Sequence, residues 1–176
     1  GLNTKRVHQP RVGFQGTAGS FGEQAAREFF HDAEAELKNY HAFDDVLSAV
    51  ANGDVDYGVL PIENSTAGDV LEVSDLIIRY NLYIVGEHTL RVRHNLLALP
   101  DAELSDITQV YSHIQALNQC HQYLKKHENI ESIPYANTAL AAEYVAAKGD
   151  IHSASIGSIR CSELYNLKVL ASDIQT

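Results

Sequence analysis

Short apolar runs alternate with helical patterns along most of this 176-residue chain, and that alternation restricts its fold more than any other feature. Between residues 11 and 80, apolar runs of strand length precede segments of helical periodicity, such as the one that carries Phe21, Ala25 and Phe29 on one face. A second series of the same kind runs from residue 94 to residue 170. Parallel strands must be joined by long crossovers, which are usually helices. The pattern therefore predicts an α/β fold with parallel-type sheets.

The two series are separated by a charged stretch, which predicts two α/β lobes around a cleft, as in periplasmic-type binding proteins. We expect residues 11–85 together with 171–176 to form the first lobe, 86–93 to be the crossing and 94–170 to form the second lobe. Residues 1–10 are expected to be a linker. The expected strands lie at 11–14, 37–40, 57–61, 82–85, 94–99, 109–111, 130–134, 153–155 and 168–170, and the expected helices begin near 20, 43, 70, 114, 138 and 158.

Composition and charge exclude several classes of partner. Apolar residues make up 45% of the chain, and the net charge is −10 without any cluster of Lys and Arg. Such a chain is not expected to bind nucleic acid or an anionic membrane, and no apolar run approaches the length of a membrane span. Cys120 and Cys161 fall in apparent helices, so we expect both to be reduced and the protein to be cytoplasmic. No histidine pairs at metal-ligand spacing with Cys, Asp or Glu, so no metal is expected.

Small polar loops follow the expected strands at the ends where parallel α/β sheets bind their ligands. The loops lie at 15–20, 61–68, 112–115, 137–138 and 155–158. Each leads into an expected helix, and free N–H groups at a helix N-terminus favour anions. The residues by themselves therefore predict a two-lobed protein that binds a small anion in its cleft.

Each candidate residue also has a purely structural interpretation. His113 can be a solvated histidine at the start of a helix, and Glu63 can accept a hydrogen bond from a nearby amide. The glycine-rich turn at 16–19 lacks the spacing of a dinucleotide-binding or P-loop motif. Helix capping alone would account for the hydroxyl residues near the expected helix starts, which are Ser20, Ser112, Thr138 and Ser158.

Taken in order, the strings at these loops resemble the prephenate dehydratase family. The matching strings are FQGTAGSFGEQAA at 14–26, GVLPIENS at 58–65 followed by Gly68, HNLL at 94–97, SHIQAL at 112–117, ASIGS at 154–158 and ELYNL at 163–167. The resemblance covers the chain from about Arg11 to its last residue. Each string is moderately specific, and the ordered set is strong.

The resemblance implies an activity and a set of site residues. The activity is the decarboxylating dehydration of prephenate to phenylpyruvate in phenylalanine biosynthesis, by a carbon–oxygen lyase that uses no cofactor and no metal. The residues expected to be catalytic are Glu63, Ser65 and His113. Those expected to bind the anionic substrate are Gly16, Ser20, Asn64, Ser65, Gly68, Ser112, Gln115 and Thr138.

The chain departs from the family pattern in two places. Ile114 occupies a position where the family usually has proline, which should cost some order at a helix start rather than chemistry. Family members also continue past a segment like 173–175 to a Thr-Arg-Phe segment whose threonine is regarded as catalytic. Because these 176 residues stop before that segment, we expect them to fold but to turn prephenate over poorly.

The resemblance leaves partners and close alternatives open. It implies a homodimer and allows a fused chorismate mutase domain and a phenylalanine-sensing regulatory domain in the native chain. Arogenate dehydratase, whose substrate differs by an amino group on the side chain, is the nearest alternative. A non-catalytic module that binds small anions is the alternative from a different class.

Overall fold

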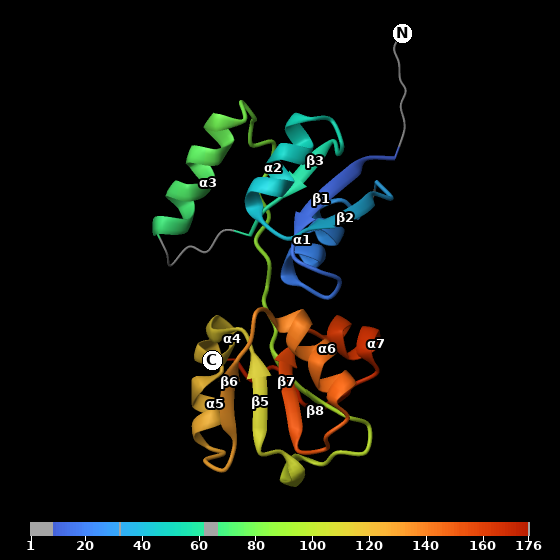
Figure 1. Ribbon diagram of the computed structural model, residues 1–176, viewed down its shortest axis with the longest axis vertical. Helices are drawn as coiled ribbons and strands as arrows, with labels where there is room; N and C mark the ends of the chain where they lie inside the picture. The colour runs from blue at the N-terminus through green and yellow to red at the C-terminus, as the bar shows by residue number, and fades with distance from the viewer. Residues whose placement is uncertain (1–8, 32, 62–66, 176) are drawn as a thin grey trace. The chain divides into compact units, whose positions relative to one another are not determined.

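The chain forms two compact units, residues 1–90 and residues 91–176. The computed structural model describes residues 9–31, 33–61 and 67–175 (Figure 1). The sequence predicts the α/β class and the presence of two lobes, and the structure confirms the class with helices and a sheet in each unit. No helix in the described part of the chain is long and apolar enough to cross a membrane.

The first unit is built on a three-stranded sheet in the order β2-β1-β3, with every pairing parallel. The central strand β1 is apolar and buried, and Val12 and Phe14 pack with Ala26 of the helix that follows. The elements are β1 (Arg11–Gln15), α1 (Phe21–Phe29), β2 (Glu36–Tyr40), α2 (Phe43–Ala51), β3 (Tyr57–Val59) and α3 (Ala67–Arg79). As predicted, α2 ends at Asn52, and Gly53 follows with a φ of 80° that favours glycine.

The expected strand at 82–85 does not form. Residues 82–90 have no regular secondary structure, and Tyr83, Ile84 and Val85 are strongly exposed. Gly86 lies against the ring of Phe29, and His88 Nε2 lies 2.9 Å from Glu28 Oε1, so this segment runs beside the end of α1. An apolar run becomes a strand only where another backbone can accept and donate its hydrogen bonds, and that condition is not visible in local sequence.

The second unit is built on a five-stranded sheet in the order β6-β5-β7-β4-β8. The strands β6, β5 and β7 are parallel to one another, whereas β4 is antiparallel to both β7 and β8. The sheet is therefore mixed: the predicted parallel-type arrangement holds for β6, β5 and β7, whereas the antiparallel direction of β4 was not predicted. The elements are β4 (Asn95–Ala98), the 3-10 helix η1 (Leu104–Asp106), β5 (Gln109–Ser112), α4 (Ile114–Gln119), α5 (His121–Lys125), β6 (Glu131–Pro134), α6 (Thr138–Lys148), β7 (Ser153–Gly157), α7 (Ile159–Tyr165) and β8 (Lys168–Ala171).

Both faces of this sheet are covered. Leu96 and Ala98 of β4 pack into one apolar cluster with Leu117 of α4, whereas Leu97 packs into a second cluster with Ala142 and residues of α7. Strand β4 is buried along its whole length, and its last three residues, Leu96 to Ala98, form a continuous apolar run instead of an alternating one. That pattern identifies a central strand but carries no information about its direction.

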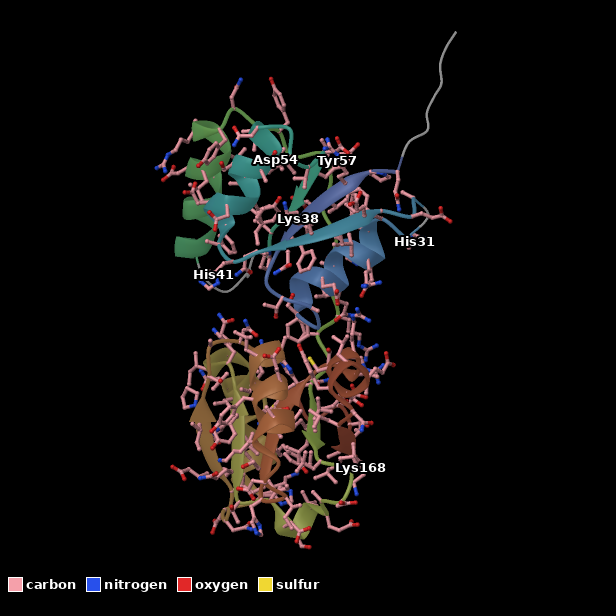
Figure 2. The ribbon with its side chains drawn as sticks, turned by 45° about the vertical axis from the view of Figure 1, so that its right-hand side comes forward. His31, Lys38, His41, Asp54, Tyr57 and Lys168 are labelled. Atoms are coloured by element: carbon pink, nitrogen blue, oxygen red, sulfur yellow. The ribbon has the colours of Figure 1, made fainter. Side chains whose placement is uncertain are left out.

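Different contacts lie at the two ends of the strands in this sheet. Lys168 begins β8 at the edge opposite to the carboxyl ends of β5, β6 and β7, where its ammonium lies 3.7 Å from Glu103 (Figure 2). At the other edge, the chain after β8 turns back onto the start of β4, and Ile174 N donates to His94 O at 2.9 Å. The sequence assigns residues 171–176 to the first lobe, but the described part of that segment belongs to the second unit. Its contacts with the start of β4 join residues some eighty positions apart, which local sequence patterns do not report.

Candidate functional site

In the first unit, the glycine-rich turn after β1 places Ser20 at the start of α1. Gly16, with a φ of 126°, donates from its backbone N–H to Tyr40 O at 2.9 Å, and Gly19 has a φ of 90°. A Cβ on Gly22 would lie 2.1 Å from the carbonyl oxygen of Gln15, so the helix begins directly against the end of the strand. These conformations and this close approach require glycine, which is why the sequence carries it at these places.

Ser20 caps the helix as the sequence predicts. Its Oγ accepts a hydrogen bond of 3.2 Å from Glu23 N, while Glu23 Oε1 accepts one of 3.1 Å from Gly19 N. Glu23 is 5% exposed, and Arg27 lies 3.5 Å from its other carboxylate oxygen. The Glu23 carboxylate therefore holds the turn by accepting a hydrogen bond from its backbone. The N-terminus of α1 would attract an anion, and Arg27 partly offsets the negative charge that Glu23 places there.

The site residues predicted after β3 fall mostly outside the described residues. Glu63, Asn64 and Ser65 lie in the segment 62–66, for which the structure gives no placement. Gly68 follows in the first turn of α3. Their assigned roles stay predictions.

In the second unit, the structure brings the remaining predicted site residues to one edge of the sheet. The parallel strands β6, β5 and β7 are neighbours, so Ser112 at the end of β5 lies opposite Pro134, and Gly157 ends the strand on its other side. The loops that follow these strands lead into α4, α6 and α7. The loops and helix starts at this one edge therefore carry His113, Gln115 and Thr138, as the parallel arrangement predicts.

The helix caps at this edge are only partly those predicted. Ser158 caps α7, but α4 is capped by His113, whose Nδ1 accepts from Gln115 N at 3.1 Å. Asn137 caps α6 by accepting from Leu140 N at 2.7 Å. Ser112 and Thr138 are thus not caps, because each lies one residue away from the position whose side chain reaches the orphan N–H groups.

Ser112 has a different hydrogen bond. Its side chain is fully buried, and its Oγ donates to the carbonyl oxygen of Ile156 on the neighbouring strand β7 at 2.9 Å. A hydroxyl has one proton, so in this arrangement the remaining capacity of Ser112 is to accept. Thr138 is also buried, with 6% exposure, whereas His113 is half-buried and Gln115 is exposed.

His113 has a defined tautomer when it is neutral. Because Nδ1 accepts the hydrogen bond from Gln115 N, the ring proton is on Nε2. The ring can therefore donate a hydrogen bond from Nε2 to a ligand at this edge. The sequence predicts a chemical role for His113, and this geometry is compatible with that role.

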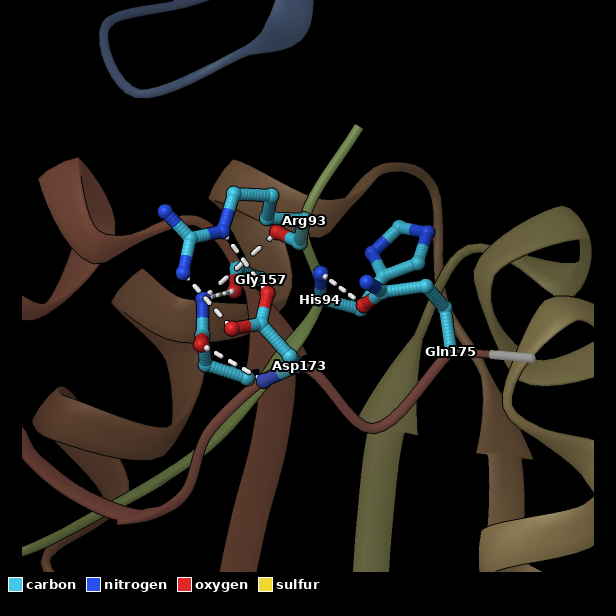
Figure 3. A network of polar contacts seen from close by, with 6 residues as sticks. Arg93, His94, Gly157, Asp173 and Gln175 are labelled. Atoms are coloured by element: carbon cyan, nitrogen blue, oxygen red, sulfur yellow. Dashed lines mark hydrogen bonds and ion pairs between the residues drawn. The ribbon is translucent and has the colours of Figure 1, made fainter. Parts of the chain in front are cut away.

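Sequence reasoning missed a polar network at the same edge, shown in Figure 3. Arg93 Nε and Nη2 donate to the two carboxylate oxygens of Asp173 at 2.7 and 2.6 Å, and these contacts lower the pKa of that carboxyl to about 2. Asn95 bridges to Gly157 and Asp173, and His94 N donates to Gln175 Oε1 at 2.7 Å. The sequence did contain a signal for it, because Asn95 is a polar residue at the start of an otherwise apolar strand, and a buried polar side chain needs hydrogen-bond partners.

Metal-ligating side chains do not gather at this edge or elsewhere in the described parts of the chain, where no group of three His, Cys, Asp or Glu could hold an ion. Cys120 and Cys161 are both buried thiols. Burial raises the pKa of the Cys120 thiol to about 12, so it is a poor nucleophile. The chemical groups that this edge offers are hydroxyls, amides, an imidazole and a guanidinium.

Comparison with known proteins gives a consistent set of similarities. The family model for prephenate dehydratase (PDT) matches residues 12–176. The chain is 41% identical over 166 residues to arogenate dehydratase 5, chloroplastic, of Arabidopsis thaliana, covering 94% of this chain and 39% of that protein. It is 36% identical over 176 residues to a bifunctional chorismate mutase/prephenate dehydratase of Enterobacter agglomerans, covering 98% of this chain and 45% of that protein.

A solved structure is also similar. The prephenate dehydratase of Arthrobacter aurescens, crystallised in complex with L-Phe, superposes with a TM-score of 0.84 at 30% identity, covering 94% of this chain and 55% of that one. The chain thus spans less than half the length of these two curated relatives and just over half of the solved chain.

Proposed function

The chain belongs to the prephenate dehydratase family, and from that premise we propose that it catalyses the decarboxylating dehydration of prephenate to phenylpyruvate, a step of phenylalanine biosynthesis. The observation that carries this proposal is the extent of the family match, which runs from residue 12 to residue 176 and so includes both units. The bifunctional relative, which is named for the same activity, supports it.

The proposed reaction needs positioning and a proton, and it balances without a cofactor. The bond between the ring and its carboxylate breaks, carbon dioxide leaves, and the electron pair enters the ring. The bond between the ring and its hydroxyl breaks at the opposite position, and the hydroxyl departs as water after receiving a proton. The ring becomes aromatic, which drives the reaction. A group that donates a proton or a firm hydrogen bond to the departing oxygen is the main chemical requirement.

Among the described residues, His113 is best suited to give a firm hydrogen bond to the departing oxygen. Its Nε2 carries the proton when the ring is neutral, and its half-buried position at the sheet edge supports contact with a ligand. Glu63 and Ser65 remain the other proposed catalytic residues. For substrate binding we retain Gly16, Ser20, Asn64, Ser65, Gly68, Ser112, Gln115 and Thr138. The hydrogen bond from Ser112 to Ile156 O supports a role in holding the edge rather than in direct donation to a carboxylate.

Arogenate is the second candidate substrate, because the arogenate dehydratase of Arabidopsis thaliana is 41% identical to this chain. Arogenate undergoes the same bond changes and yields phenylalanine instead of phenylpyruvate. The two substrates differ only at the side chain, where one has a keto group and the other an ammonium group. Which of them is used depends on the groups around that position.

The test supplies each substrate separately to the full-length protein. Phenylpyruvate is followed by its absorbance in alkali and phenylalanine by chromatography, while calorimetry measures the binding of prephenate and of phenylpyruvate. Turnover of prephenate supports the proposal, and turnover of arogenate alone transfers it to the second candidate. Binding of prephenate without turnover of either substrate would instead support the non-catalytic anion-binding module.

The setting of the protein is part of the same proposal. Buried thiols that form no disulfide support a reducing compartment, the cytoplasm. The name of the bifunctional relative supports a fused chorismate mutase domain in the native chain. A homodimer is the proposed assembly, and light scattering on the purified protein tests it.

A further inference from the structure

The side chain of Asn95 joins three segments of the second unit that are distant in sequence. Its Nδ2 donates to the carbonyl oxygen of Gly157 at 3.1 Å and lies 3.5 Å from that of Arg93, and its Oδ1 accepts from Asp173 N at 3.2 Å. The residue is 1% exposed, so water does not compete for these contacts. The segments that meet here are the entry to β4, the end of β7 and the chain that follows β8.

A carboxamide meets the requirements of this position on both sides. Two backbone carbonyls face one end of the side chain and need a donor, whereas a backbone N–H faces the other end and needs an acceptor. A carboxylate would repel the carbonyl of Gly157, and an apolar side chain would leave buried polar groups unpaired at a cost in stability.

The segment held by Asn95 is fastened at further points. Asp173 adopts a φ of 52°, unusual for a residue with a side chain, and its carboxylate is held by Arg93. Ile174 N donates to His94 O, and Gln175 Oε1 accepts from His94 N. Residues 173–175 therefore lie fixed along the start of β4, and Asn95 transmits their position to the end of β7.

The end of β7 is in turn connected to the candidate site. Its last two carbonyl oxygens each accept from a side chain on a neighbouring strand: that of Ile156 from Ser112 of β5, and that of Gly157 from Asn95 of β4. Ser112 immediately precedes His113, the proposed hydrogen-bond donor. A shift at Gly157 would therefore move Ser112 and the residues that follow it.

We propose that Asn95 is a positioning residue of the substrate site, which fixes the end of β7 and through Ser112 the loop that carries His113 and Gln115. The inference rests on the proposed function, because the ligand concerned is prephenate or its product. Asn95 does not touch the ligand. Asn95 determines where this loop lies before the ligand arrives. Displacing the loop should therefore weaken binding through Gln115 and slow the chemical step through His113.

The test uses Asn95→Asp in the full-length protein, with Lys168→Gln as the matched control. The Asp variant keeps the acceptor for Asp173 N and removes the donor to Gly157, whereas the control removes a charged contact at the opposite edge of the sheet. We expect kcat/KM for prephenate to fall roughly tenfold in Asn95→Asp, which corresponds to about 1.4 kcal/mol, and the dissociation constant for phenylpyruvate to rise. The control should match the parent in both constants.

A pH series separates positioning from a general loss of structure. A carboxyl introduced at this buried place can donate to Gly157 when it is protonated, so the dissociation constant of Asn95→Asp for phenylpyruvate should recover towards the parent value between pH 8 and pH 5.5. The readout is the ratio of the variant's dissociation constant to the parent's, which should fall towards one as the pH falls. The ratio removes any pH dependence that the two proteins share through the ligand or through the other ionisable groups nearby, which are Arg93, His94, His113 and Asp173.

Two outcomes would overturn the inference. One is an unchanged kcat/KM and affinity in Asn95→Asp, which together with a lower melting temperature would make Asn95 merely structural. The other is a weakened affinity that does not recover in acid. If the parent protein neither bound nor turned over either substrate, the proposed function itself would fail, and the role of Asn95 in it would fail too.

Discussion

The hydroxyl of Ser112, at the end of β5, donates a 2.9 Å hydrogen bond to the carbonyl oxygen of Ile156 on β7. Both residues are fully buried, so the contact ties two parallel strands together at the edge where the candidate site lies. This relationship makes Ser112 a residue of the sheet as well as of the site.

Ser112→Ala should therefore lower stability and weaken ligand binding. Losing one buried hydrogen bond costs roughly 1 kcal/mol, which calorimetric melting would detect. The control is Ser155→Ala: Ser155 is equally buried, but its Oγ has no hydrogen-bond partner among the described residues, so the change should be close to neutral. Titration with phenylpyruvate gives the second measurement. A lower melting temperature with unchanged affinity would leave Ser112 with a structural role only.

His113→Asn should reduce catalysis while preserving the helix start. Asparagine is among the best residues at an N-cap, so α4 keeps its cap, but the imidazole Nε2–H is lost. Removing one preorganised hydrogen-bond donor typically costs about a hundredfold to a thousandfold in rate, and we expect kcat for prephenate to fall within that range. Circular dichroism should show that the fold is retained. A kcat equal to that of the parent would rule out His113 as the group that assists the departing hydroxyl.

The ion pair of Arg93 with Asp173 predicts a pH dependence of stability. Hydrogen bonds from Arg93, with a further contribution from Gln175, lower the pKa of the Asp173 carboxyl from 3.8 to about 2. Unfolding restores the ordinary pKa, so the unfolded chain takes up the proton first as the pH falls. The stabilisation is present above about pH 4 and is lost towards pH 2.

Arg93→Gln removes this contribution. Urea unfolding should show the variant to be less stable than the parent at pH 7, and the gap should narrow as the pH falls from about 4. Lys168→Gln supplies the comparison. Lys168 pairs with the carboxylate of Glu103 at 3.7 Å, a longer contact than that between Arg93 and Asp173. A gap that stays constant down to pH 3 would contradict this assignment of the pKa.

The two cysteines should resist alkylation in the folded protein. Cys120 and Cys161 are both 0% exposed, and burial raises the pKa of Cys120 to about 12, so little thiolate is present at neutral pH. Mass spectrometry after treatment with iodoacetamide should find both thiols unmodified in buffer and both modified in guanidinium chloride. Rapid modification in buffer would show that these parts of the second unit open readily.

Local signals in the sequence were enough to predict the class of fold and much of the candidate edge. These signals are the alternation of apolar runs with helical periodicity, the glycines around Ser20 and the loops after β5, β6 and β7. Each depends only on residues close together in the chain, so it can be interpreted from the sequence alone. The resemblance at these loops added the family. The role of His113 at the site stays a prediction, and the structure gives it the capping role that the sequence assigned to Ser112.

The pairing of distant segments was decided only by the tertiary structure. Three features depend on which backbone segments become neighbours in space. They are the antiparallel direction of β4, the packing of residues 173–175 onto its start and the three contacts of Asn95. The converse case is the apolar run Tyr83, Ile84 and Val85. Its pattern predicts a strand, but no strand in the described parts of the chain pairs with it and the three side chains are exposed. A residue's propensity is local, whereas its hydrogen-bond partner lies wherever the fold brings another chain segment.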